Sequence, residues 1–164
     1  MFSDESLHRA ESLITSARAR GLKIATVESC TGGLIAGCIT AIAGSSDVFD
    51  RGFVTYSNEA KSDLVNVPAS LIARVGAVSE EVARSMAEGA LRVTTADAAV
   101  AVTGIAGPGG GSADKPVGLV HIAAARRDGR TTHERHVFPG DRTAIRLLSV
   151  DAALTCLAAL IALE

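Results

Sequence analysis

Three predicted strands end in residues with hydroxyl groups, and together these residues could form one reactive site. Ser29 follows the first strand, Tyr56-Ser57 closes the second, and Thr103 closes the third. Ligands of open α/β sheets collect outside the carboxyl ends of parallel strands. If these strands are parallel, the hydroxyl groups lie along one edge of the sheet, where a serine with a base beside it can attack a carbonyl carbon.

Thr31, Gly32 and Gly33 follow Ser29 where a helix is expected to begin. The free backbone N–H groups of such a turn can hold an anion or an oxyanion. An ordinary strand-to-helix turn has the same residues, and an isolated Ser-x-Thr-Gly-Gly favours neither interpretation. Cys30 is a competing nucleophile, but it has no evident partner, and free cysteines are more often small core residues.

Lys61 is the predicted base for Ser29. It falls in the first turn of an expected helix that Asn58 caps and that begins beside Tyr56. There the helix dipole disfavours a positive charge and, with partial burial, lowers the pKa of a lysine. The chain has three lysines against thirteen arginines, and an arginine cannot give up its proton. A solvated surface lysine is the alternative.

The four histidines are poorly placed to serve as the base. His8 lies on the first expected helix, whereas His121, His133 and His136 fall on a C-terminal hairpin. The His133-x-x-His136 interval puts the two rings on opposite faces of a strand, so they do not form a metal pair. We interpret all four as surface residues and expect no metal site.

The composition predicts one soluble domain over residues 1–164. The chain has 164 residues, a net charge of −2 and 48% hydrophobic residues, too many for a disordered chain. The balanced charge and 3% aromatic content give no reason to expect nucleic acid as a partner. Arg146 and Asp151 interrupt the apolar segment 143–163, which indicates a buried helix rather than a membrane span. The lack of a signal-peptide pattern and of a Cys-x-x-Cys pair favours the reducing cytoplasm.

Hydrophobic periodicity and turn residues predict an α/β fold with five strands, helices between the first three and a hairpin at the end. This order indicates a mixed sheet in an α/β/α sandwich. The expected strands are 23–28, 52–57, 97–103, 117–126 and 131–138. The expected helices are 4–19, 34–43, 58–65, one that Ser79 caps and one that Asp141 caps. The glycine-rich segment 104–112 lacks the ending of a nucleotide triphosphatase loop; it could approach a ligand or form a flexible lid.

Six segments, in order, resemble the CinA C-terminal domain family, and the resemblance extends over residues 5–162. They are ESCTGG at 28–33, VTYSNEAK at 54–61, VSEEV at 78–82, TGIAGP at 103–108, PVGLV at 116–120 and FPGDR at 138–142. The resemblance implies a three-layer α/β/α sandwich on a five-stranded mixed sheet. Enzymatic members of the family are nicotinamide-nucleotide amidases of NAD salvage, which hydrolyse nicotinamide mononucleotide without a metal or other cofactor.

Matching motifs imply roles for individual residues. The serine nucleophile of the family falls on Ser29, its lysine base on Lys61 and its assisting tyrosine on Tyr56. These roles describe acyl transfer: the serine attacks the carboxamide, backbone N–H groups hold the oxyanion, ammonia leaves, and water hydrolyses the acyl-enzyme.

The same matching implies contacts with the substrate, a small-molecule nucleotide. The substrate-contacting threonine of the family matches Thr103, which Gly104 follows. Its arginine near the last helix most nearly matches Arg142, a candidate for the phosphate, although Arg146 lies one helical turn further on.

Two other functions stay open at this point. One is a non-catalytic nucleotide-binding or adaptor module, and the other is a hydrolase of another small amide. Larger family members have an N-terminal domain resembling molybdopterin-binding proteins, which we do not expect here, nor its pyrophosphatase activity. We expect no membrane partner, and small apolar helix faces are compatible with a homo-oligomer.

Overall fold

The predicted strands form one mixed sheet in the computed structural model, which describes residues 2–163. Their order across the sheet is β2-β1-β3-β4-β5, with bounds Ile24–Glu28 for β1, Phe49–Val54 for β2, Ala98–Gly104 for β3, Leu119–Arg126 for β4 and Thr131–Val137 for β5. β1 pairs in parallel with β2 and β3, whereas β4 is antiparallel to β3 and β5. The carboxyl ends of β1, β2 and β3 therefore lie at one edge of the sheet.

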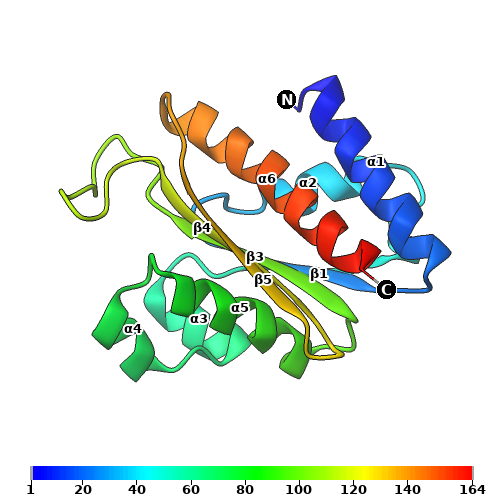
Figure 1. Cartoon of the computed structure of the whole chain (residues 1–164), viewed down its shortest axis with the longest axis horizontal. Helices are drawn as coiled ribbons and strands as arrows, with labels where there is room; N and C mark the ends of the chain where they lie inside the picture. The colour runs from blue at the N-terminus through cyan, green and yellow to red at the C-terminus, as the bar shows by residue number, and fades with distance from the viewer. Residues whose placement is uncertain (1, 164) are drawn as a thin grey trace.

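Helices cover both faces of this sheet (Figure 1). One layer consists of α1 (Asp4–Ala19), α2 (Leu34–Thr40) and α6 (Arg142–Ala162), and the other of α3 (Asn58–Val65), α4 (Ala69–Val75) and α5 (Glu80–Val93). A 3₁₀ helix, Ser45–Asp47, precedes β2. The α/β/α sandwich on a five-stranded mixed sheet is confirmed.

Side-chain oxygens cap the helices where the sequence predicts, with one correction. Ser3, Ser79 and Asp141 each accept a hydrogen bond from the amide three residues further on, which is the usual N-cap contact. At α3 the cap is Ser57 rather than Asn58, which is the first helical residue. The correction moves Lys61 to the fourth residue of α3 and leaves it at the start of the helix.

β2 begins and ends three residues earlier than the predicted strand 52–57. β2 is an edge strand, and its first half contains three consecutive exposed residues, Asp50, Arg51 and Gly52. This half therefore lacks the hydrophobic alternation by which a strand is predicted. Thr55 continues the pairing, because its amide donates to the carbonyl of Glu28 at 2.8 Å before the chain turns into α3.

α4 is a helix that the sequence analysis does not predict. It begins directly after Pro68, and Ile72 is its buried residue. So short a helix with one buried position has no helical periodicity to detect. Two other elements are shorter than predicted, since α2 ends at Thr40 and β4 begins at Leu119.

Residue size differs between the two faces of the sheet and determines how closely the helices approach. The face toward α1 and α6 carries Ile24, Val100, Val102, Val120 and Ile122, whereas the face toward α5 carries Ala25, Ala99, Ala101, Ala123 and Ala125. The alanines let α5 pack close to the strands. Gly89 lets α5 contact α3 as well, because a Cβ there would collide with the carbonyl of Val65. α3, which carries Lys61, is fixed by this contact.

α6 is long and apolar enough to cross a membrane by length and composition alone. In its most apolar stretch of 18 residues, 50% is buried inside the protein. There the helix packs on α1, β3 and β4. Its interrupting charges have partners: Arg146 donates to the carbonyls of Cys30 and Thr31, and Asp151 accepts from the hydroxyl of Ser6. These contacts agree with the predicted buried helix.

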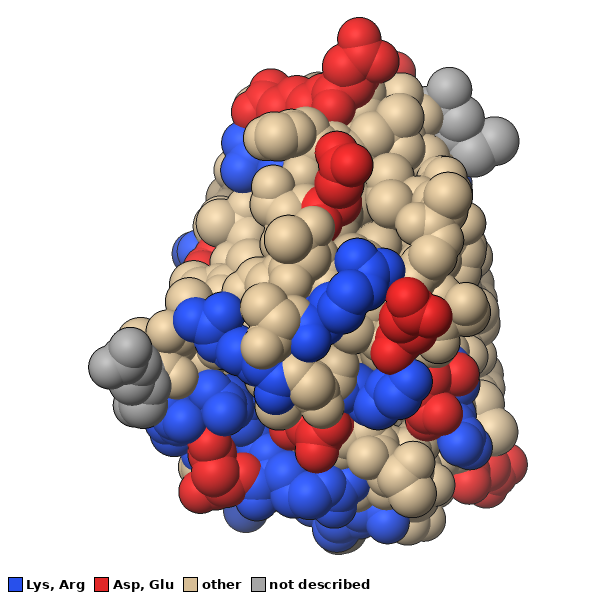
Figure 2. Space-filling model, turned by 90° about the vertical axis from the view of Figure 1, so that its right-hand side faces the viewer, with Lys and Arg blue, Asp and Glu red and all other residues tan. Residues whose placement is uncertain are grey.

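Lys and Arg side chains gather on the lower part of the face seen in Figure 2, with acidic side chains among them. At the β4–β5 hairpin, Arg126 and Arg130 pair with Asp128, and nearby Arg92 pairs with Glu88. The basic side chains of this hairpin thus have acidic partners beside them.

Candidate active site

The site lies where the chain leaves β1 and β2 for opposite faces of the sheet. After β1 it enters α2, in the layer of α1 and α6, and after β2 it enters α3, in the layer of α5. Ligands of open α/β sheets bind at such a switch, outside the carboxyl ends of the strands. Ser29 directly follows β1, and Lys61 lies near the start of α3.

Ser29 and Lys61 meet at this edge of the sheet. The Nζ of Lys61 lies 3.1 Å from the Oγ of Ser29 and also donates to the carbonyl oxygens of Thr55, at 2.9 Å, and Ser57, at 3.4 Å. Lys61 is 1% exposed and Ser29 is 9% exposed. An amine at hydrogen-bond distance from a nearly buried serine hydroxyl has the geometry of a base and its nucleophile.

Burial lowers the pKa of Lys61 below its ordinary value, because the charged amine loses its hydration. The Cys30 thiol and the Glu59 carboxylate act in the opposite direction but are weaker influences. The environment therefore makes the neutral amine, which is the form that can accept a proton, easier to reach than in an exposed lysine. Burial, nearly complete rather than partial as expected, is the main cause.

The carboxylate of Glu28 accepts hydrogen bonds from backbone amides, including one that was expected to bind an anion of the substrate. This fully buried carboxylate accepts hydrogen bonds from three amides at the start of α2, including that of Gly33 at 3.0 Å. The amide of Gly32 donates to the carbonyl of Ser29 at 3.1 Å. The amides of Gly32 and Gly33 are thus bonded within the protein, which corrects the expectation that both are free for an anion.

Cys30 and Thr31 supply the amides of this turn that have no oxygen acceptor within residues 2–163. Gly32 and Gly33 have φ values of 58° and 99°, which glycine adopts without strain. The glycines shape the turn, and the amides of Cys30, which is 7% exposed, and Thr31, which is 0% exposed, remain as candidate donors to an oxyanion.

The Cys30 thiol is a poor competitor of Ser29. Cys30 is buried, and burial raises the pKa of its thiol to about 11. Little thiolate is present at neutral pH, and the thiolate is the reactive form. Cys38 and Cys156 are likewise buried as free thiols.

Tyr56 and Arg142 are exposed and contact each other at the same edge of the sheet. Tyr56 is 61% exposed, and its hydroxyl accepts a hydrogen bond from Nη2 of Arg142 at 3.1 Å. Nη1 of Arg142 donates to the carbonyl of Gly107 at 2.9 Å, in the glycine-rich segment. Within residues 2–163, Lys61 makes no hydrogen bond to Tyr56. The structure therefore brings Tyr56 to the candidate phosphate-binding arginine rather than to the base.

Arg146, the alternative arginine, lies on the turn that follows Ser29. Its Nε and Nη2 donate to the carbonyl oxygens of Cys30 and Thr31, both at 3.0 Å. Arg146 thus holds protein backbone, and the exposed Arg142 is the better-placed candidate for an anion.

Thr103 and Gly104 end β3 at the same edge of the sheet. Thr103 is 1% exposed, and its hydroxyl donates to the carbonyl of Ala77 at 2.9 Å. A Cβ on Gly104 would lie 2.8 Å from the carbonyl oxygen of Leu119, so the close pairing of β3 and β4 already requires glycine there. Both residues have structural contacts, and their contact with a substrate stays a prediction.

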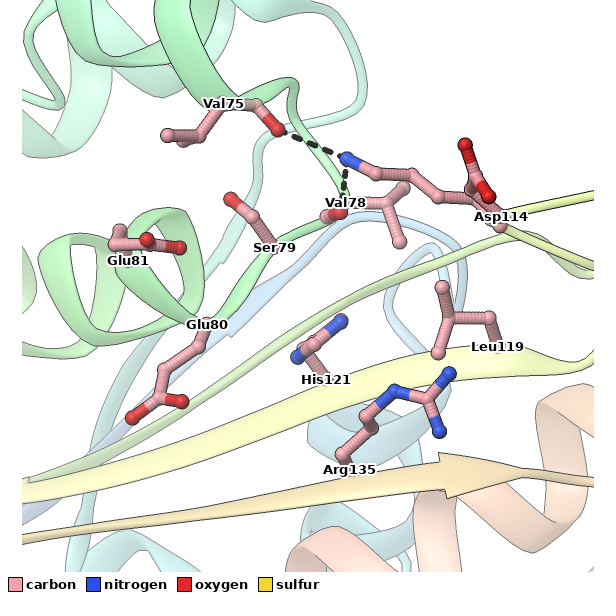
Figure 3. A pocket seen from close by; sticks show the side chains of 10 residues that line it. Val75, Val78, Ser79, Glu80, Glu81, Asp114, Leu119, His121 and Arg135 are labelled. Atoms are coloured by element: carbon pink, nitrogen blue, oxygen red, sulfur yellow. Dashed lines mark hydrogen bonds between the residues drawn. The ribbon is translucent and has the colours of Figure 1, made fainter.

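An open cavity of about 460 Å³ lies on the α5 side of the sheet (Figure 3). It adjoins the end of β3, because His121 in its lining pairs with Thr103 across the sheet. Lys115 lines the cavity and donates to the carbonyls of Val75 and Val78, both at 2.8 Å. Acidic and basic side chains alternate around it, so the lining has no single sign of charge.

His121 is not a surface residue, contrary to expectation. It is 8% exposed, it stacks on His133, and its Nδ1 lies 2.9 Å from Nε2 of that ring. Burial lowers the pKa of His121 to about 4, and the neighbouring charges of His133, Arg135 and Lys115 act in the same direction. Within residues 2–163, no three His, Cys, Asp or Glu side chains form a metal-binding group.

Stability is expected to fall as the pH decreases from 6.5 to about 4, because the unfolded chain protonates His121 in that range and the folded chain does not. The folded-state pKa lies below the unfolded value, so this contribution is complete above pH 6.5. His121→Asn removes the titrating ring, and its melting temperature should vary less across this range than that of the wild type. Calorimetry measures both, with the exposed His8→Asn as the control; equal pH dependence in all three would refute the assignment.

Glu28 is the residue of the site whose role the sequence analysis missed. A signal was present, because this carboxylate ends the mostly apolar β1, directly before Ser29. A buried carboxylate requires hydrogen bonds, and the nearest donors after a strand are the amides of the following helix. What the sequence lacked was the knowledge that position 28 is fully buried.

The profile of the CinA C-terminal domain matches residues 7–161 of the chain. The nicotinamide-nucleotide amidohydrolase PncC of Enterobacter agglomerans is 53% identical over 146 residues, which cover 88% of this chain and 89% of that protein. The protein of the same name from Escherichia coli K12 is 48% identical over 157 residues, 96% of this chain and 95% of that protein. A CinA-like protein of Geobacter sulfurreducens is 56% identical over 84% of this chain, which spans only 33% of that longer protein.

Solved structures resemble the whole fold. The competence/damage inducible protein CihA from Agrobacterium tumefaciens has a TM-score of 0.96 and 52% identity, with 98% of each chain covered. A competence-damaged protein (CinA) superfamily protein from Klebsiella pneumoniae has a TM-score of 0.91 and 36% identity, with 96% of this chain and 98% of that chain covered.

Proposed function

Because the chain belongs to the CinA C-terminal domain family, we propose that it converts nicotinamide mononucleotide to nicotinic acid mononucleotide and ammonia. Its near-full-length similarity to the PncC proteins supports an amidohydrolase acting on a nicotinamide nucleotide. The observation that carries the proposal is the 3.1 Å contact between Ser29 Oγ and Lys61 Nζ. It supports a serine mechanism in which the base is a lysine.

In the proposed reaction, neutral Lys61 takes the hydroxyl proton of Ser29 as the serine oxygen attacks the carboxamide carbon. The amides of Cys30 and Thr31 stabilise the oxyanion of the tetrahedral intermediate. Lys61 then gives its proton to the departing ammonia, and the carbon–nitrogen bond breaks to leave an acyl ester on Ser29. Water, activated by the same amine, hydrolyses the ester. Proton transfer and the oxyanion donors can each supply a factor of about 10²–10⁴.

In this proposal Tyr56 assists by contacting Arg142 and does not carry the proton between Ser29 and Lys61. Its hydroxyl accepts from Arg142, and the contact of Ser29 with Lys61 needs no intermediary. Tyr56 and the carbonyl of Gly107 both accept hydrogen bonds from the guanidinium of Arg142 and fix its orientation. We assign Tyr56 to this assisting role, in orienting the residue that recognises the nucleotide.

Arg142→Ala is expected to lower kcat/KM for the mononucleotide by about 10–100-fold, because charge-assisted hydrogen bonds to a phosphate contribute about 1.5–3 kcal/mol. The loss for nicotinamide riboside, which has no phosphate, should be far smaller. Arg20→Ala is the matched control, since Arg20 lies at the C-cap of α1 and donates to Ser16. Steady-state ammonia release from both substrates measures the difference. Equal losses on the two substrates would show that Arg142 does not bind the phosphate.

Quantifying both products from the purified protein tests the function itself. Incubation with nicotinamide mononucleotide should release ammonia and nicotinic acid mononucleotide in equal amounts. Nucleotide binding without ammonia would favour a non-catalytic nucleotide-binding module. Ammonia from a different small amide, but not from the mononucleotide, would favour a hydrolase of another substrate. The proposed chemistry uses side chains and amides of this chain, so metal chelators should leave the rate of ammonia release unchanged. We propose that the reaction takes place in the cytoplasm.

A further inference from the structure

The turn after Ser29 is held from two sides by buried or half-buried charges. From β1, the Glu28 carboxylate accepts from the amides of Gly33 and Ile35, both at 3.0 Å, and of Ala36 at 2.8 Å. Glu28 is 0% exposed, so it depends on these hydrogen bonds for its solvation. The carboxylate thereby joins the end of β1 to the start of α2.

From α6, Arg146 holds the carbonyl side of the same turn. Its guanidinium donates to the oxygens of Cys30 and Thr31, both at 3.0 Å. The planar fork of an arginine fixes two acceptors in one plane, which a lysine cannot do. Gly32 belongs to this contact, because a Cβ there would lie 3.4 Å from Nη2 of Arg146.

We infer that Glu28 and Arg146 are positioning residues of the amidase reaction, an inference that rests on the proposed function. They bond the carbonyls of Cys30 and Thr31 and the amide of Gly33, and neither of them takes up the two amides next to Ser29. Removing either charge frees the turn to move. A displacement of about 1 Å at a reacting group can cost about 100-fold in rate.

Arg127 provides a control with the same chemistry at the other end of the sheet. It donates to the carbonyl oxygens of Leu91, Thr94 and Ala96, around the end of α5. An arginine that only stabilises the fold should behave like Arg127. A positioning residue should also change the chemical step.

The test compares Arg146→Ala with Arg127→Ala in two assays. Arg146→Ala should lower kcat for ammonia release by about 100-fold, with KM close to that of the wild type and equal loss on the mononucleotide and the riboside. Arg127→Ala should lower the melting temperature without this loss of kcat. The second assay follows reaction of Ser29 with a fluorophosphonate, in which the serine oxygen displaces fluoride, and this rate should also fall in Arg146→Ala alone.

If Arg146→Ala does not fold, Arg146→Lys and Glu28→Gln replace it in both assays. Each should also lower kcat, but by less than about 100-fold. Unchanged kcat in folded variants overturns the inference, as does a higher KM confined to the mononucleotide, which would make Arg146 a phosphate ligand. If the wild type labels at Ser29 but releases no ammonia, the proposed substrate fails and the labelling rates still decide the inference. A wild type inert in both assays contradicts both proposals.

Discussion

Ser29→Ala is expected to abolish ammonia release from nicotinamide mononucleotide while the fold stays intact. The variant removes the oxygen that forms the acyl ester in the proposed reaction, and loss of a serine nucleophile can cost about 10⁶-fold in kcat. The Oγ of Ser29 bonds to Lys61, so its loss leaves that amine with its two carbonyl partners and changes no packing. Ammonia assays and thermal melts of the purified variant measure the two effects.

Cys30→Ala is the matched control for this variant. Cys30 is adjacent in the turn, but the raised pKa of its thiol, about 11, keeps it protonated. Most activity should remain in Cys30→Ala. If Cys30→Ala released no ammonia and Ser29→Ala remained active, the serine mechanism would be wrong.

Lys61→Arg is expected to be nearly as damaging as Lys61→Ala, with each losing about 10²–10⁴-fold in kcat/KM. Arginine keeps the positive charge and the donors, but it cannot become a neutral base. In the wild type the rate should rise with pH as Lys61 loses its proton, because the neutral amine is the active form. The midpoint of that acidic limb should lie well below about 10.4, the pKa of an unperturbed lysine, since burial lowers the pKa of Lys61.

Lys115→Arg is the corresponding control. Lys115 donates to two backbone carbonyls, those of Val75 and Val78, and an arginine can keep that contact. Its pH–rate profile should match that of the wild type. An active Lys61→Arg enzyme would mean that Lys61 serves only as a cation.

The meeting of Ser29 and Lys61 could be predicted from the sequence because it depends on topology. Once β1 and β2 are parallel neighbours, the residues that follow them must lie at one edge of the sheet. A one-residue error in the cap of α3, Asn58 for Ser57, leaves Lys61 near the start of that helix. The pairing thus tolerates small errors in element bounds.

The parts that sequence analysis missed depend on burial, which local patterns do not reveal. Glu28 has the sequence of a polar strand end, yet it is fully buried and takes the amides of α2. His121 has the position of a hairpin surface residue, yet α5 covers its face of the sheet. Both errors concern polar residues at the boundary between the sheet and a helix layer.

The central claim is that Ser29 carries the acyl group of the substrate, and mass spectrometry tests it most directly. Turnover of nicotinamide mononucleotide is quenched in acid, and the tryptic peptide 24–51, which contains both Ser29 and Cys30, is fragmented. The account predicts an adduct on Ser29 with the mass of the substrate less ammonia, absent from Ser29→Ala. Ammonia release with the adduct on Cys30 would contradict it.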